Sequence, residues 1–286
     1  LESSGGDRRA IAIGHERVAL CLEKLGRCTE SIKHFQTAIS VATEPNWCDN
    51  WSPIPSYSGI SRVLEGERQF DEAEAHVERI LTLIDRRISS NSSGDDQQAL
   101  SWIHEIRGDI LREADRHEEA IAEYRKSIEI GNQVEGFDDL SLRSDLQRSL
   151  VALGRFDEAL AAMDTFPLNQ ESESDPQRIA VCFRCRGDIL SRAGRYEKAI
   201  TEYRKSVQAG MSLHRQTDWT PWSALNGIQK SHVALGRFDE ALVTMDEYIC
   251  FVKEKADRRS VAFGQEIRGD ILREAGRHEE AIAEYR

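Results

Sequence analysis

Apolar residues recur with a helical period on both sides of a short polar break near position 115. Before the break, Ile106 and Ile110 lie one turn apart, and after it Ala120, Tyr124 and Ile128 follow at intervals of four. Such spacing places the apolar side chains on one face of a helix. The pattern therefore predicts two consecutive amphipathic helices joined by a tight turn.

This helix–turn–helix pattern repeats along the whole chain. Residues 107–125 read RGDILREADRHEEAIAEYR and residues 268–286 read RGDILREAGRHEEAIAEYR, so the two copies differ only at Asp115 and Gly276. A third copy, RGDILSRAGRYEKAITEYR, covers 186–204, and a second type, such as LVALGRFDEALAAMD at 150–164, alternates with the first. A small residue after each turn marks the repeats: Ser31, Ala73, Ala120, Ala159, Ala199, Ala241 and Ala281. Their spacing predicts about seven repeats of roughly 40 residues, an architecture in which each repeat packs on its neighbours.

Helix ends carry their own signals. Gly-Arg at several turns suits a first helix that ends in a positive-φ glycine. An aspartate, a good N-cap, precedes four of the first helices: Asp7, Asp96, Asp175 and Asp257. The other type has Trp51-Ser52-Pro53 and Trp219-Thr220-Pro221, which predict a capping hydroxyl followed by proline, with Phe137 at the matching aromatic position.

The repeat resembles the tetratricopeptide repeat family, and its long period is similar to the kinesin light chain type. The resemblance rests on small and aromatic positions: Gly108, Ala120, Tyr124, Gly154, Phe156, Ala159, Gly187, Gly194, Tyr196, Ala199 and Tyr203. It implies an all-α fold, a right-handed superhelical solenoid of paired antiparallel helices. We expect residues 1–286 to form a single array, which stops within the second helix of its last repeat and is thus truncated at the C-terminus.

The Arg-Gly-Asp triplet occurs three times, at 107–109, 186–188 and 268–270. This triplet is an adhesion signal when it lies on an exposed loop. Here it tracks the repeat and falls inside the first helix, with glycine as the small residue that lets two helices approach. We therefore interpret it as a structural element.

Composition argues against two classes of function, nucleic-acid binding and membrane insertion. The net charge is −12, and the mean hydropathy is −0.54. An acidic chain without a basic cluster does not suit nucleic acid, and no apolar run is long enough to span a membrane. Six thinly spread cysteines favour reduced thiols and a cytoplasmic protein.

No catalytic or metal-binding pattern is complete. Cys182 and Cys185 have CxxC spacing, but no second ligand pair accompanies them, so core thiols are the better interpretation. His117 and His278 occupy a position that holds Tyr or Phe in other repeats. We expect a non-enzyme with no metal and no cofactor.

One position in the first helices alternates between base and acid: Arg62, Asp109, Arg148, Asp188, Lys230 and Asp270. The resemblance places this position on the concave face, where family members hold peptides. Together with the aromatic residues Trp102 and Phe263, the residues from Asp109 to Asp270 in this row are our candidate partner-binding residues. The alternative is a ladder of ion pairs between repeats, each contributing about 0–1 kcal/mol.

Three functions are consistent with this sequence. The first is a scaffold that binds a protein or peptide in its concave groove, without nucleic acid or membrane. The second is the sensor or regulatory arm of a larger signalling ATPase or caspase-like protease. The third is a self-assembling array that associates through its open ends.

Overall fold

The computed structural model describes residues 4–43, 54–90, 94–134, 137, 139–164, 175–211, 220–254 and 257–286. Within these ranges the chain forms helices and no strand. The helices are α1 (Ser4–Lys24), α2 (Cys28–Thr43), α3 (Ile54–Gly66), α4 (Phe70–Ser90), α5 (Gly94–Glu113), α6 (His117–Gly131), α7 (Leu140–Ala152), α8 (Phe156–Asp164), α9 (Pro176–Arg192), α10 (Tyr196–Met211), α11 (Trp222–Ala234), α12 (Phe238–Glu254), α13 (Arg258–Glu274) and α14 (His278–Glu284). The predicted all-α class is confirmed.

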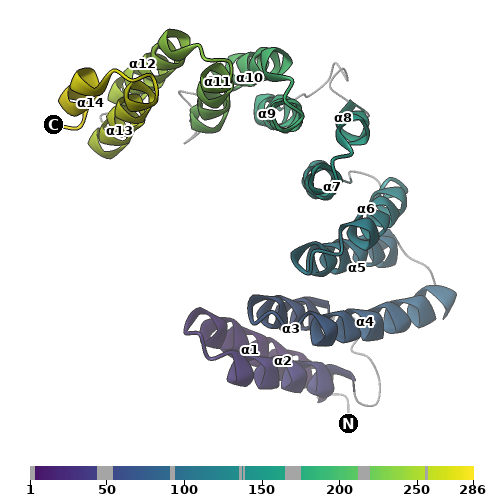
Figure 1. Ribbon diagram of the computed structural model, residues 1–286. Helices are drawn as coiled ribbons and strands as arrows, with labels where there is room; N and C mark the ends of the chain where they lie inside the picture. Colours follow the sequence, from purple (N-terminus) through teal and green to yellow (C-terminus); the bar gives the residue numbers. More distant parts are fainter. Residues whose placement is uncertain are drawn as a thin grey trace. The chain divides into compact units, whose positions relative to one another are not determined.

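The chain divides into two compact parts, Leu1–Ser149 and Leu150–Arg286. Within each part, consecutive helices pack side by side, as α1 with α2 and α5 with α6 in the first part, and α9 with α10 and α11 with α12 in the second (Figure 1). That all repeats form one continuous array stays a prediction.

Each part has a core built from successive repeats. In the first part, Ile60, Val77 and Ile103 are fully buried together although they come from α3, α4 and α5. In the second part, Ile228 and Met245 belong to one such cluster. The small residues that mark the repeats, from Ser31 to Ala281, are all buried, as the pattern predicted. They are small because a larger side chain would hold the paired helices apart.

The turns between paired helices share one backbone conformation. Glycines occupy its left-handed position in five turns, at Gly26, Gly154, Gly194, Gly236 and Gly276, all with φ between 70° and 76°. The equivalent residues Arg68 and Asp115 adopt φ of 58° and 60° without being glycine. After Gly194, the amide of Arg195 donates a hydrogen bond back to the carbonyl of Leu190 at 2.8 Å, which closes the helix end. The predicted glycine turn is confirmed.

The predicted helix starts are correct in part. Asp175 caps α9 by accepting from the amide of Gln177 at 2.9 Å, and Asp257 caps α13 in the same manner. Asp7 and Asp96, however, lie inside α1 and α5, which begin at Ser4 and Gly94. No proline stops these helices at the aspartate, and an acidic residue near a helix N-terminus is favourable without being the cap.

The prediction that a hydroxyl followed by proline caps the first helix is wrong at α11. α11 begins at Trp222, and Pro221 occupies the N-cap position without a capping side chain, so the Thr220 hydroxyl is not the cap. The reason is that the carbonyl of Pro221 itself accepts the first helical hydrogen bond, from Leu225. Phe137 packs against Gly131 at the end of α6. Residues 51–53 and Trp219 lie outside the described residues.

Candidate partner-binding face

The glycine of each RGD triplet makes room for a tyrosine from the paired helix. A Cβ atom on Gly108 would lie 2.6 Å from Cε1 of Tyr124, and one on Gly187 would lie equally close to Tyr203. Gly269 stands in the same relation to Tyr285. Real Cβ atoms do not approach other atoms this closely, so the glycine is required for the helices to pack.

The aspartate of each triplet accepts a hydrogen bond from that tyrosine. The Tyr124 hydroxyl donates to Asp109 at 2.8 Å, and the Tyr203 hydroxyl donates to Asp188 at 2.7 Å. Tyr285 binds Asp270 at 2.9 Å. Burial and the neighbouring aspartate raise the pKa of Tyr203 above its ordinary value. The hydroxyl therefore stays protonated and fixes the carboxylate near the surface.

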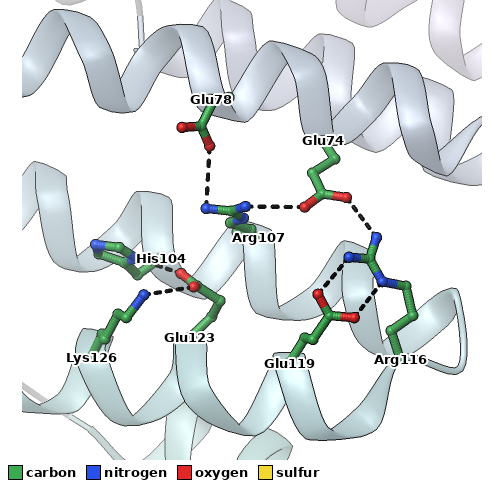
Figure 2. Close-up of polar contacts among 8 residues, drawn as sticks. All are labelled: Glu74, Glu78, His104, Arg107, Arg116, Glu119, Glu123 and Lys126. Carbon is green, nitrogen blue, oxygen red and sulfur yellow. Dashed lines mark hydrogen bonds and ion pairs between the residues drawn. The ribbon is translucent and has the colours of Figure 1, made fainter.

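The arginine of each triplet reaches the second helix of the preceding repeat. Figure 2 shows Arg107 on α5 between Glu74 and Glu78 of α4, at 3.1 and 3.2 Å. Arg186 pairs with Asp164 and Arg268 pairs with Asp246. All three residues of the triplet thus hold helices together, and their place inside α5, α9 and α13 is as predicted.

The alternating row predicted from the sequence lies on the first helices, and the structure gives its members mostly local partners. Arg148 pairs with Asp145 one turn earlier at 2.9 Å, and Asp188 pairs with Arg184 at 2.7 Å. Arg62 contacts Glu23 of α1 at 2.7 Å, while Lys230 is exposed. Among the described side chains, these pairs do not join successive members of the row. The ion pairs in the structure therefore differ from a ladder in which successive members of the row pair with one another.

Carboxylates gather around Asp109 in the first part of the chain. Glu105 lies one turn before it on α5, and burial together with Asp109 and Asp145 raises the pKa of Glu105 to about 7. Burial and Asp109 also raise the pKa of Asp145 on α7 and of Glu65 on α3. We call Glu65, Glu105, Asp109 and Asp145 the carboxylate cluster. Its like charges make it a favourable place for a cation.

Exposed aromatic side chains accompany the row. Trp102 is 39 % exposed on α5, and with Glu105 and Asp109 it follows the i, i+3, i+7 spacing of one helix face. Phe263 is 38 % exposed and packs edge-on against Trp222, with ring centroids 4.8 Å apart. The Trp222 ring also lies against the ring of Tyr248, with centroids 4.9 Å apart.

The candidate residues for chemistry occupy structural positions of the repeat. Cys182 and Cys185 are buried within α9, as expected of core thiols. His117 and His278 each open a second helix, at the position that Phe156 and Tyr196 hold elsewhere. In the described ranges, no group of three or more His, Cys, Asp or Glu residues is arranged to hold a metal ion. No described helix is long and apolar enough to cross a membrane.

Sequence reasoning missed three features of this face. The carboxylate cluster joins residues of three helices, which no local pattern reveals. The tyrosine–aspartate bond did leave a signal, because Tyr124, Tyr203 and Tyr285 occur four residues after the small residue only in repeats that carry RGD. Trp222 was overlooked in favour of Trp219.

Comparison with known proteins identifies the repeats. A family profile described as tetratricopeptide repeat matches residues 103–131 and 186–209, and a second profile with that description matches 141–165. These segments are tetratricopeptide repeats, and the family recognised from the sequence is confirmed. Repeats of this kind generally serve as scaffolds for protein interactions. Among curated proteins, no sequence matches the chain.

Solved structures share the fold at low identity. BtubC (BKLC) from P. vanneervenii is 14 % identical with a TM-score of 0.57, over 87 % of this chain and 92 % of that chain. A putative kinesin light chain with nearly identical TPR-like repeats from Podosopora anserina is 12 % identical with a TM-score of 0.57, over 76 % of this chain and 100 % of that chain. The Rap protein complexed with Competence and Sporulation Factor is 12 % identical with a TM-score of 0.50, over 96 % of this chain and 74 % of that chain.

Proposed function

We propose that the chain is a non-catalytic scaffold that binds a polypeptide through its first-helix face. The partner-binding residues in this proposal are Trp102, Asp109, Arg148, Asp188, Lys230, Phe263 and Asp270. The repeat family supports a protein-interaction role in general, and Rap, which has the same fold, was solved in complex with Competence and Sporulation Factor.

The carboxylate cluster is the observation that carries the proposal. Glu105 and Asp145 lie close enough to Asp109 for their pKa values to rise, so keeping both ionised costs free energy in the isolated chain. A lysine or arginine of a partner would relieve this repulsion. Trp102, one turn away, offers an apolar surface for the neighbouring residue of the partner, and tryptophan is favoured at binding hot spots.

In this proposal the first part of the chain accepts a cationic side chain followed by an apolar one. The second part offers a different chemistry. Asp188 and Asp270 pair with Arg184 and Arg273, much as Asp109 and Asp145 pair with Arg112 and Arg148 in the first part, but among the described residues a raised carboxylate pKa is found in the first part alone. In the second part Lys230 and the exposed edge of Phe263 remain as contacts. A partner with interspersed charges fits both parts, and its binding should weaken only moderately with salt, because the charge pairs are short.

The test uses peptides selected from a random library on the immobilised chain, with affinity measured by fluorescence polarisation. Glu105→Lys with Asp145→Lys should weaken binding of peptides that contact the first part at least tenfold. Lys230→Glu should likewise weaken, with intact folding, the binding of peptides that contact the second part. Glu129→Lys, an exposed carboxylate on the second helix α6, is the matched control and should leave affinity unchanged.

Thermal melting of each variant separates binding from folding. Unaltered affinity with a lowered melting temperature would show that the row serves the structure and that the partner binds elsewhere. Equal losses in the Glu129→Lys control would mean that overall charge, rather than this face, governs binding.

A further inference from the structure

Two histidines meet between the paired helices of the first repeat. His15 of α1 and His34 of α2 lie 19 residues apart in the sequence, so no local spacing reveals the pair. Their Nδ1 atoms are 2.9 Å apart, and their ring centroids are 5.1 Å apart. Both side chains are partly buried, so they lie at the edge of the helix pair rather than in its core. A hydrogen bond of this kind requires one ring to carry its proton on Nδ1 and the other to offer its Nδ1 lone pair.

The third repeat shows what this place holds when it is part of an ion pair. In the repeat register His15 corresponds to His104, and His34 corresponds to Glu123. Figure 2 shows that pair, in which Nδ1 of His104 lies 2.6 Å from the Glu123 carboxylate. Lys126 also binds this carboxylate, at 2.9 Å. In the third repeat the protein's own ammonium group thus neutralises the site.

The first repeat has no such internal cation. Thr37 stands where the third repeat has Lys126, and its hydroxyl donates to the carbonyl of Lys33 at 2.8 Å. Among the described side chains, no carboxylate or ammonium group forms a hydrogen bond or an ion pair with His15 or His34. The first repeat therefore presents two imidazoles that bind only each other.

Two imidazoles that face each other from paired helices are a ligand set for a divalent transition-metal ion. Zn²⁺ binds imidazole nitrogen at about 2.0–2.1 Å, so two nitrogens on one tetrahedral ion lie about 3.3–3.4 Å apart. The Nδ1 atoms of His15 and His34 are closer than this by about half an ångström. Small ring rotations supply that difference, because the last side-chain torsion of histidine has a broad energy minimum.

We propose that His15 and His34 bind a zinc ion that joins α1 to α2. Water completes the coordination, since no third His, Cys, Asp or Glu among the described residues joins the pair. When the ion binds, one ring loses its proton from Nδ1 and gains one on Nε2, so both rings stay neutral and no net proton is released. The ion replaces one hydrogen bond by two metal–nitrogen bonds, and it therefore stabilises the first repeat by mass action. This site does not depend on the proposed function.

Isothermal titration calorimetry of the full chain with ZnCl₂ near neutral pH tests the proposal. His15→Gln and His34→Gln each remove one ligand, and each should weaken zinc binding at least tenfold. The first variant should fold, because Gln265 stands at this place in the seventh repeat. Zn²⁺ should raise the melting temperature of the unchanged chain and of neither variant. Mg²⁺, which prefers oxygen ligands, should leave all three melting temperatures unchanged.

Nuclear magnetic resonance of the imidazole nitrogens reports the ligands directly, and Zn²⁺ should shift the Nδ1 signals of both His15 and His34. His76→Ala is the matched control. His76 holds the place of His34 in the second repeat, but it faces the Tyr57 ring, with centroids 6.5 Å apart, so this variant should keep the full affinity for zinc.

A second control removes the thiols of the same two helices. Cys21→Ser with Cys28→Ser should leave zinc affinity unchanged, and circular dichroism verifies that each variant folds. The proposal is overturned if both glutamine variants bind zinc as tightly as the unchanged chain. It is also overturned if either control loses the zinc affinity, or if Zn²⁺ raises the melting temperature of the His15→Gln chain as much as that of the unchanged chain.

Discussion

Gly187→Ala should destabilise the chain because the added methyl group has no room. A Cβ atom at Gly187 would lie 2.6 Å from Cδ1 and Cε1 of Tyr203, whose side chain is almost fully buried. Tyr203 cannot move aside, because Gly227 of α11 lies against the same ring and would itself clash if it carried a Cβ atom. The ring thus lies between two glycines from different helices.

The magnitude follows from two opposing effects. Overpacking of a core ordinarily costs about 1–3 kcal/mol. Replacing glycine by alanine inside a helix returns up to about 1 kcal/mol. Because the ring is confined on both sides, we expect a net loss of about 1–2 kcal/mol in the free energy of unfolding.

Gly14→Ala provides the matched control for this prediction. Gly14 also lies inside a first helix, but nothing lies within 4 Å of a Cβ atom built there. This variant should gain about 0.5–1 kcal/mol from helix propensity alone. Urea denaturation followed by circular dichroism measures both changes. If Gly187→Ala also raised stability, the close approach of α9, α10 and α11 would be wrong.

Three further predictions concern single positions. Asp115→Gly should raise the free energy of unfolding and Gly276→Asp should lower it, by about 1 kcal/mol or less each, because both positions have positive φ that glycine adopts more easily. Urea denaturation measures both changes, and changes of the same sign would contradict this. Ala159→Leu should cost about 1–3 kcal/mol, since Ala159 of α8 is fully buried, and unchanged thermal stability would show that the helix register is wrong. Burial and nearby carboxylates raise the pKa of Glu105 from 4.5 to about 7, so its protonated form is favoured by folding and this stabilisation is lost as the pH rises between these values. Glu105→Gln should therefore melt at a higher temperature than the unchanged chain at pH 8, with a difference that shrinks toward pH 4.5, and a pH-independent difference would refute the shift.

The repeat pattern predicted the helices well because it is local. A buried residue such as Ala120 and a positive-φ glycine such as Gly194 satisfy constraints that a few neighbouring residues impose. The structural interpretation of RGD rests on the same kind of local pattern, because the triplet always lies at one fixed distance before the small residue of its repeat.

Other features depend on contacts that a linear pattern does not contain. The helix starts at Asp7 and Asp96 were misplaced, because nothing in the preceding residues stops α1 or α5 from extending backwards. The carboxylate cluster needs α3, α5 and α7 to meet, and the cause of the raised pKa of Glu105 is visible only in that arrangement.

The central claim is that a polypeptide binds along the first helices, and hydrogen–deuterium exchange of the chain with a library-selected peptide tests it most directly. The account predicts that bound peptide slows amide exchange in the segments that carry Trp102 and Asp109, or Lys230 and Phe263, and that Glu105→Lys with Asp145→Lys abolishes the protection in the first part. Protection confined to the second helices α6, α10 and α12, with α5 and α13 exchanging as in the free chain, would contradict it.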